Sequence, residues 1–362
     1  MIHGSRNLPA GGRLQNNPVI VTAAVLIILT WLRYAQDLVV PFLLSLFITV
    51  IAAAPMGWLK KRGFGPTAAV STVFLGIVFI GLLMAALLGG SFHAFTVKLP
   101  EYQEHLRRMA DGVLDWLSSR GLDISHSVIR EVIDPGSVMV FANGLVSSIG
   151  EGLSHTFLLM FTVFFMLMES WELPDKLAGM ETERSRQTVS RLVEVIDSTK
   201  QYTSIKALMS LVTGMLVWLG CSLIGLDFAI LWGFIAFMLN FIPTIGSIIA
   251  AVPAVLLAVV QLGPMMALAV AGLYVAVNMI IGNLIEPRYM GRRVGLSTLV
   301  VFLSMVFWGW LLGPVGMLLS VPLTMVSKFA AQANENTRWV AILLGPEMAL
   351  QKASDADKVS AS

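Results

Sequence analysis

Long apolar runs, separated by short polar segments, fill most of the chain. A helix that crosses a bilayer needs about 20 mostly apolar residues, because only a helix satisfies its own backbone amides and carbonyls where water is absent. Six runs approach or exceed this length and predict full spans: 18–31, 38–59, 67–92, 153–171, 205–226 and 265–285. The pattern therefore predicts an all-α, polytopic transmembrane protein.

Two further apolar regions, 228–262 and 296–329, are each interrupted near the middle by Pro and Gly. Their halves are only about 15 residues long, so each region is either a helical hairpin or a pair of short spans, giving eight or more membrane segments. As hairpins they would enter from opposite sides, with the tips Pro243 to Gly246 and Gly313 to Gly316 close together. Paired broken helices mark transporter binding sites, because they expose backbone polar groups to a ligand.

The two broken regions also share sequence features. The first reads LWGFIAFMLNFIPTIGSIIAAVP over 231–253, and the second reads FWGWLLGPVGMLLSVP over 307–322. Each contains a Trp-Gly pair, a Pro/Gly break and a later Val-Pro pair. This likeness is compatible with a true internal repeat and equally with two separate uses of helix-breaking residues.

The polar segments complete the predicted organisation. Residues 98–150 hold five Lys/Arg and seven Asp/Glu, with apolar residues at helical spacing, which predicts a small extracytoplasmic helical cap. The predicted order is a cytoplasmic tail over 1–17, three spans within 18–97, the cap over 98–150, a span over 151–172, a cytoplasmic amphipathic helix over 173–204, a transmembrane core over 205–329 and a cytoplasmic tail over 330–362.

Basic residues beside the apolar runs predict the orientation. Lys and Arg are enriched on the cytoplasmic side of membrane spans. The clusters here are Arg6 with Arg13, Lys60 to Arg62, Arg288 with Arg292 and Arg293, and Lys328. All four are therefore predicted to be cytoplasmic, as are both termini.

Composition excludes several classes of function. Of 362 residues, 56% are hydrophobic and 13% are charged, with a formal net charge of +2, which is too mild for nucleic-acid binding. Cys221 is the single cysteine, so the chain has no internal disulfide and no cysteine metal cluster. Motifs of metalloproteases, serine hydrolases and nucleotide-binding loops are missing, and the histidines lack metal-ligand spacing. We expect no cofactor, no metal and no enzymatic activity.

Polar side chains inside the apolar runs are the candidate site residues, with hydrogen bonds between helices as the alternative role. Glu286 is predicted to form a local ion pair with Arg288, Arg292 or Arg293, or to exchange a proton. Lys206 is expected to extend to the membrane surface at the start of its span. The candidates for a substrate pathway or hinge are Asn240, Pro243, Thr244, Gly246, Pro253, Asn278, Asn283, Glu286, Arg288, Gly313, Pro314, Gly316 and Pro322.

Three late stretches resemble a known family. NFIPTIGSIIAAVP over 240–253, NLIEPRYMGRRVGLSTLVVFLS over 283–304 and FWGWLLGPVGMLLSVPLT over 307–324 are similar to the autoinducer-2 exporter family, or PerM-like permeases, of the bacterial inner membrane, especially its TqsA-type members. The resemblance extends from about Val40 to Lys328 and is weakest in the termini and the cap. Thr244 departs from the aromatic or amide residue frequent in relatives.

The resemblance implies a secondary exporter of the quorum-sensing signal autoinducer-2 or a similar small polar molecule. It also implies a homo-oligomer within the lipid bilayer, with pentamers in the family. Some relatives are described as sodium/proton antiporters, which makes antiport the alternative function, motivated by Glu286. A membrane scaffold without transport activity is the third hypothesis.

Overall fold

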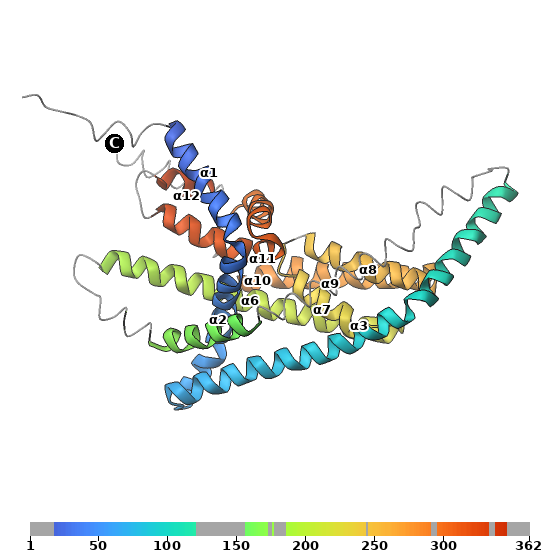
Figure 1. The fold of residues 1–362 in the computed structure, drawn as a ribbon, viewed down its shortest axis with the longest axis horizontal. Helices are drawn as coiled ribbons and strands as arrows, with labels where there is room; N and C mark the ends of the chain where they lie inside the picture. Colours follow the sequence, from blue (N-terminus) through green and yellow to red (C-terminus); the bar gives the residue numbers. More distant parts are fainter. Residues whose placement is uncertain are drawn as a thin grey trace, which may run out of the picture.

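The computed structural model describes residues 18–120, 156–172, 176, 186–243, 245–290, 295–332 and 337–345, and in these residues the secondary structure is helical with no strand (Figure 1). Six helical stretches are long and apolar enough to cross a membrane: Gln36–Lys61, Pro66–Met109, Val193–Ile224, Ile245–Leu262, Pro264–Met290 and Thr298–Gln332. The prediction of an all-α, polytopic membrane protein is confirmed. The predicted spans 38–59, 67–92 and 265–285 each lie within one of these stretches, and 205–226 does so except for its last two residues. A helix over 156–172 occupies most of the predicted span 153–171.

The first two predicted spans differ from their expected arrangement. α1 (Pro18–Tyr34) and α2 (Gln36–Lys61) are separated by Ala35 alone. The Ala35 amide donates to the Trp31 carbonyl, and the Ala35 carbonyl accepts from Val39. Helical hydrogen bonds therefore continue on both sides of Ala35, and the chain bends there without reversing its direction (Figure 1). With Arg6 and Arg13 and Lys60 to Arg62 all predicted to be cytoplasmic, these two helices would have to run antiparallel, and the structure does not have that arrangement. The cytoplasmic position of residues 1–17, which lie outside the described residues, remains a prediction.

Two helices run through boundaries that the polar pattern had suggested. α3 (Pro66–Ser119) continues from the apolar run into the predicted cap, so the described part of the cap is an extension of a membrane helix, and residues 121–155 lie outside the description. α6 (Arg186–Ile224) likewise joins the predicted amphipathic helix to the next span. A change from apolar to polar residues alters what surrounds a helix, but it does not by itself end the helix, and α3 continues even through Pro100.

The helices pack in two main groups. In the first, α2, the start of α3 and the helix over 156–172 bury Ala52, Val70 and Leu167 together. In the second, α6 packs against α7 (Ala229–Leu239), α8 (Ile245–Leu262) and α9 (Pro264–Val277). The chain then continues through the π-helix η1 (Asn278–Ile285), α10 (Glu286–Met290), α11 (Thr298–Gln332) and α12 (Arg338–Leu343).

α11 folds back on itself at Gly313. This glycine has φ 69° and ψ −155°, a backbone conformation essentially restricted to glycine, and Pro314 then begins the second arm. The Trp308 indole Nε1 donates to Thr324 Oγ1 at 2.9 Å, although these residues would lie about 24 Å apart in a straight helix. Lys328 closes the base of the fold by donating to the Gly295 carbonyl. The second broken region is thus a hairpin.

α7 and α8 form the first hairpin. α7 ends at Leu239, Asn240 to Pro243 make a turn, and α8 begins at Ile245. At the base of the hairpin, Gln261 at the end of α8 accepts from the Asp227 amide at 2.9 Å and donates to the Gly225 carbonyl at 3.1 Å. The two ends of the region therefore lie together, as they do in the second hairpin. Whether either hairpin enters the membrane only partway, and whether the two tips approach one another, remain predictions.

The hairpin glycines should be more sensitive to substitution than other helical glycines. A Cβ on Gly246 would lie 1.8 Å from the Leu239 carbonyl oxygen, and one on Gly316 would lie 2.0 Å from the Trp308 carbonyl oxygen. We expect Gly246→Ala and Gly316→Ala each to lower the free energy of unfolding by about 3 kcal/mol. Gly272→Ala, in open space within α9, should stabilise by about 0.5–1 kcal/mol. Unfolding of detergent-solubilised variants measures both effects, and equal losses at all three sites would contradict the hairpin geometry.

Candidate functional site

The tip of the first hairpin meets a buried polar face of α6. Asn240, which ends α7, donates from Nδ2 to Ser210 Oγ at 3.0 Å. Both residues are buried. Next to the tip, Phe241 makes an edge-to-face ring contact with Phe47 of α2, with 5.4 Å between the ring centroids. The hairpin tip is thus held between two long helices, with its amide directed toward α6.

One turn along α6, a second polar contact joins this helix to the end of the sixth predicted span. Lys206 Nζ lies 2.7 Å from Glu286 Oε1 and 2.9 Å from Oε2. The two side chains are only 7% and 14% exposed. A charge held alone in an apolar environment is very costly. Each of these charges is therefore stable inside the protein only because the other is present.

The π-helix η1 sets the position of Glu286. It covers Asn278–Ile285 and leads directly into α10, whose first residue is Glu286. A π-turn contains more residues per turn than an α-turn, so it rotates all later side chains relative to the preceding helix. Such turns are rare and frequent at functional sites. The sequence gives only a weak signal for this turn, because the apolar stretch NMIIGNLI is also typical of an ordinary membrane-spanning helix.

The structure corrects two predictions about charged residues. Glu286 pairs with Lys206 and not with Arg288, which is exposed; Arg292 and Arg293 lie outside the described residues. Lys206 is buried, with its ammonium group bound to Glu286 and not extended away from the protein. Sequence spacing could not reveal this pair, because its members are 80 residues apart.

The other candidate residues divide between the two hairpins and their surroundings. Asn240, Pro243 and Gly246 lie at the first tip, and Gly313, Pro314 and Gly316 lie at the second. Thr244 is outside the described residues. Pro253 and Pro322 lie inside α8 and α11 and do not end them. Asn278 is half-buried beside Gly282, whereas Asn283 faces outward and does not join the buried contacts.

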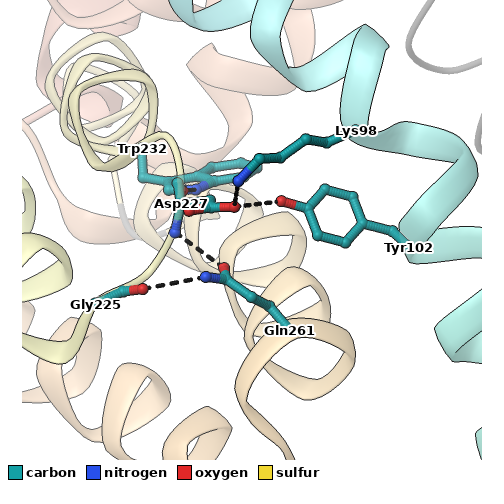
Figure 2. Close-up of polar contacts among 6 residues, drawn as sticks. All are labelled: Lys98, Tyr102, Gly225, Asp227, Trp232 and Gln261. Carbon is teal, nitrogen blue, oxygen red and sulfur yellow. Dashed lines mark hydrogen bonds and ion pairs between the residues drawn. The ribbon is translucent and has the colours of Figure 1, made fainter.

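A separate polar cluster holds the base of the first hairpin to α3 (Figure 2). Asp227 Oδ2 accepts from Lys98 Nζ at 2.6 Å and from the Tyr102 hydroxyl at 2.6 Å. The Asp227 backbone carbonyl accepts from the Trp232 indole at 2.9 Å. Together with the two hydrogen bonds that Gln261 makes with Asp227 and Gly225, these contacts join α3, the α6–α7 loop and α8 at one point. We call Lys98, Tyr102, Asp227 and Gln261 the base cluster.

The charge state of Asp227 supports the cluster over a wide pH range. Burial by itself would raise the pKa of the Asp227 carboxyl, but the hydrogen bonds from Lys98 and Tyr102, with the nearby positive charge, outweigh it and lower the pKa below its ordinary value. A carboxyl with a depressed pKa in the folded state stabilises that state above its unfolded pKa, near 4, and loses this effect only as the pH falls further. The sequence analysis did not identify this cluster, because its members come from three separate segments.

Comparison with known proteins identifies the family. The family model for AI-2E family transporters matches residues 19–336. The chain belongs to the AI-2E transporter family. It is 39% identical to the AI-2 transport protein TqsA of Escherichia coli strain K12 over 326 residues, covering 90% of this chain and 94% of that protein. The expected resemblance to TqsA-type members is therefore confirmed.

Other relatives carry less specific names. The putative transport protein YhhT of Escherichia coli strain K12 is 36% identical, with 90% of this chain and 93% of that protein covered. A putative transport protein of Haemophilus influenzae is 38% identical, with 92% and 98% covered. This AI-2E family member is thus a multi-pass membrane transporter homologue. The residues that the family model matches include both hairpins and the Lys206–Glu286 pair.

Removing one partner of the Lys206–Glu286 pair should destabilise the protein more than removing both. Glu286→Gln leaves the Lys206 charge buried without its counter-ion, so we expect the free energy of unfolding to fall by about 3 kcal/mol. The double variant Lys206→Met/Glu286→Gln should recover most of this loss. Glu172→Gln, which breaks an exposed pair with Lys176, should have no measurable effect and serves as the control. Additive losses in the double variant would contradict the pairing.

The base cluster should protect the loop before α7 from opening. We expect Asp227→Asn to increase amide hydrogen exchange in residues 225–232 a few-fold, because it removes the charge that Lys98 binds. Glu104→Gln, which affects an exposed pair within α3, is the matched control and should leave this exchange unchanged. In the unmodified protein, protection of 225–232 should stay constant from pH 8 to pH 5 after correction for intrinsic exchange, since the pKa of Asp227 lies lower. A loss of protection in that range would contradict the assigned charge state.

Proposed function

We propose that this AI-2E family member is a secondary exporter of autoinducer-2 or a similar small polar molecule. The observation that carries the proposal is the first hairpin, whose tip places the Asn240 amide on a buried polar face of α6, one turn from the Lys206–Glu286 pair. The name of the relative TqsA, AI-2 transport protein, supplies the substrate class. Export from the bacterial inner membrane is the direction that the family likeness favours.

The broken helices give this proposal its chemistry. At each break the regular hydrogen bonds between successive helical turns are interrupted. At the first tip the amides of Asn240 to Ile242 and of Ile245 and Gly246 donate within the turn, so the tip offers a polar ligand carbonyl oxygens and side-chain groups. The second break also holds Gly313 in a conformation that other residues rarely adopt. A small molecule with several oxygen atoms matches such donors and acceptors better than an apolar one does.

Sodium/proton antiport is the second candidate function, and the burial of Glu286 favours it. A buried carboxylate can bind a cation or a proton, as intramembrane acids often do. Against this role, Lys206 already neutralises the carboxylate through contacts to both of its oxygens. A sodium ion or proton would have to displace a bound ammonium group, so a neutral substrate fits the arrangement better.

An oligomeric assembly is part of the proposal. α3 exposes large apolar side chains along its membrane part, including Leu75, Phe79 and Leu82. These side chains need an apolar partner, which lipid or a second copy of the chain would supply. We propose a homo-oligomer on the family likeness, with lipid covering the rest of this surface.

Export can be tested by measuring the signal on both sides of the membrane. In a strain that produces autoinducer-2 but lacks this transporter, we expect the intracellular concentration to rise and the external concentration to fall. The unmodified gene and Gly272→Ala should restore export, whereas Gly316→Leu should not, because its side chain would displace the hairpin arm. An unchanged distribution in the deletion strain would contradict export. Loss of partner recruitment without any change in flux would indicate the scaffold role.

Antiport predicts a different result from the same protein. In everted vesicles, an antiporter would produce a sodium-dependent change of internal pH that disappears in Lys206→Met/Glu286→Gln. An exporter of a neutral solute should show no such signal in the unmodified protein. A sodium-dependent pH change that requires Glu286 would favour the antiporter.

A further inference from the structure

α6 carries a continuous line of polar residues on its buried face. Thr199, Thr203, Lys206, Ser210 and Thr213 follow one another at steps of four, three, four and three residues, the spacing that keeps side chains on one face of a helix. Four of them are buried, and Thr199 is half-buried. We call these five residues the α6 polar stripe. It extends about 21 Å along the helix.

Three hydroxyls of the stripe have no hydrogen-bond partner among the described residues: those of Thr199, Thr203 and Thr213. Thr203 is only 1% exposed and Thr213 only 6%. Threonines in helices commonly donate to the carbonyl four residues earlier, as Thr49 and Thr72 do here. An unpartnered buried hydroxyl costs free energy, so each such group in a native structure needs an explanation.

The charge balance of the stripe indicates what it could bind. Lys206 and Glu286 neutralise each other, and the remaining groups are hydroxyls and the Asn240 amide. The stripe therefore has no net charge with which to attract a free cation or anion. Its hydroxyls can both donate and accept. We infer that the α6 polar stripe is the binding surface for a small, neutral, polyoxygenated solute, which the hydroxyls of Thr203 and Thr213 bind directly.

The hairpins lie where they can close the two ends of this surface. Asn240, at the first tip, binds Ser210, and beyond Thr213 the same face of α6 becomes apolar at Val217 and Cys221. The polar stripe therefore ends within about one turn of the first tip.

Toward the other end of the stripe, Val321 and Met325 of α11 pack on Tyr202, the residue before Thr203. Ser320, next to Val321, is fully buried and also lacks a partner among the described residues. Both hairpins thus contact α6, the first at Ser210 within the stripe and the second at Tyr202 beside it, and movement of the first tip away from Ser210 would open the stripe.

This inference rests on the proposed export function, and binding to purified protein separates the two. The variant is Thr203→Val/Thr213→Val, which keeps the side-chain shape and removes two hydroxyls, and the control is Thr72→Val. The probes are autoinducer-2, D-ribose as a neutral polyhydroxylated compound, and sodium chloride. The readout is the thermal unfolding temperature with and without each probe, together with autoinducer-2 efflux.

We expect autoinducer-2 or ribose to raise the unfolding temperature of the unmodified protein and of Thr72→Val. The double valine variant should bind the same probe about tenfold more weakly, while its unfolding temperature without ligand is unchanged or higher, because unpartnered hydroxyls have been removed. If the two hydroxyls instead stabilise the fold, the double valine variant should unfold at a lower temperature than the unmodified protein. Ribose binding that depends on the hydroxyls, without any autoinducer-2 effect, would support the stripe and contradict the proposed substrate.

Two outcomes would overturn the inference without affecting the proposed function. One is autoinducer-2 efflux at the unmodified rate in Thr203→Val/Thr213→Val. The other is a thermal shift with autoinducer-2 that is equal in the variant and the unmodified protein. Stabilisation by sodium chloride alone that is lost in the variant would also contradict a neutral solute.

Discussion

The ion pair between Lys206 and Glu286 is the interaction on which the arrangement of the transmembrane core depends. Neither charge can remain in an apolar environment without the other, so the pair fixes the position of α6 relative to the end of the η1 segment. The same stretch of α6 receives the first hairpin tip through Ser210 and the second hairpin through Tyr202. One long helix thus contacts both broken regions as well as Glu286.

The two hairpins are built on the same physical plan. Each turns at a Pro/Gly break, each contains a glycine that lies against the backbone of its other arm, and each is closed at its base by a polar side chain from the second arm. In the first hairpin that closing residue is Gln261, and in the second it is Lys328. Backbone groups freed by a break are tolerated in a membrane only where protein or water surrounds them, and the first tip is accordingly packed against α6 and α2. This shared plan favours the interpretation of the two hairpins as an internal repeat.

The sequence predicted the features that depend on local composition. Hydrophobic run length gave most of the spans, and Pro243 and Gly313 marked the two turns, because these residues act on the backbone at their own position. It failed where the outcome depends on distant contacts. Glu286 had arginines close by in sequence, yet its partner lies 80 residues earlier, and the base cluster joins Lys98 to Asp227 across 129 residues. The bend at Ala35 and the extended helices α3 and α6 were also missed. No Gly or Pro lies at Ala35 or at the polar-to-apolar boundary in α6, and in α3 the helix continues through Pro100.

The proposed export requires the first hairpin tip to leave α6 so that a solute can pass. It can be tested by joining Ser210→Cys and Asn240→Cys through a disulfide in a Cys221→Ala background and measuring autoinducer-2 efflux. The account predicts that efflux is lost on oxidation and recovered on reduction, while either single cysteine variant is insensitive to oxidation. Undiminished efflux from protein shown to be fully cross-linked would contradict it.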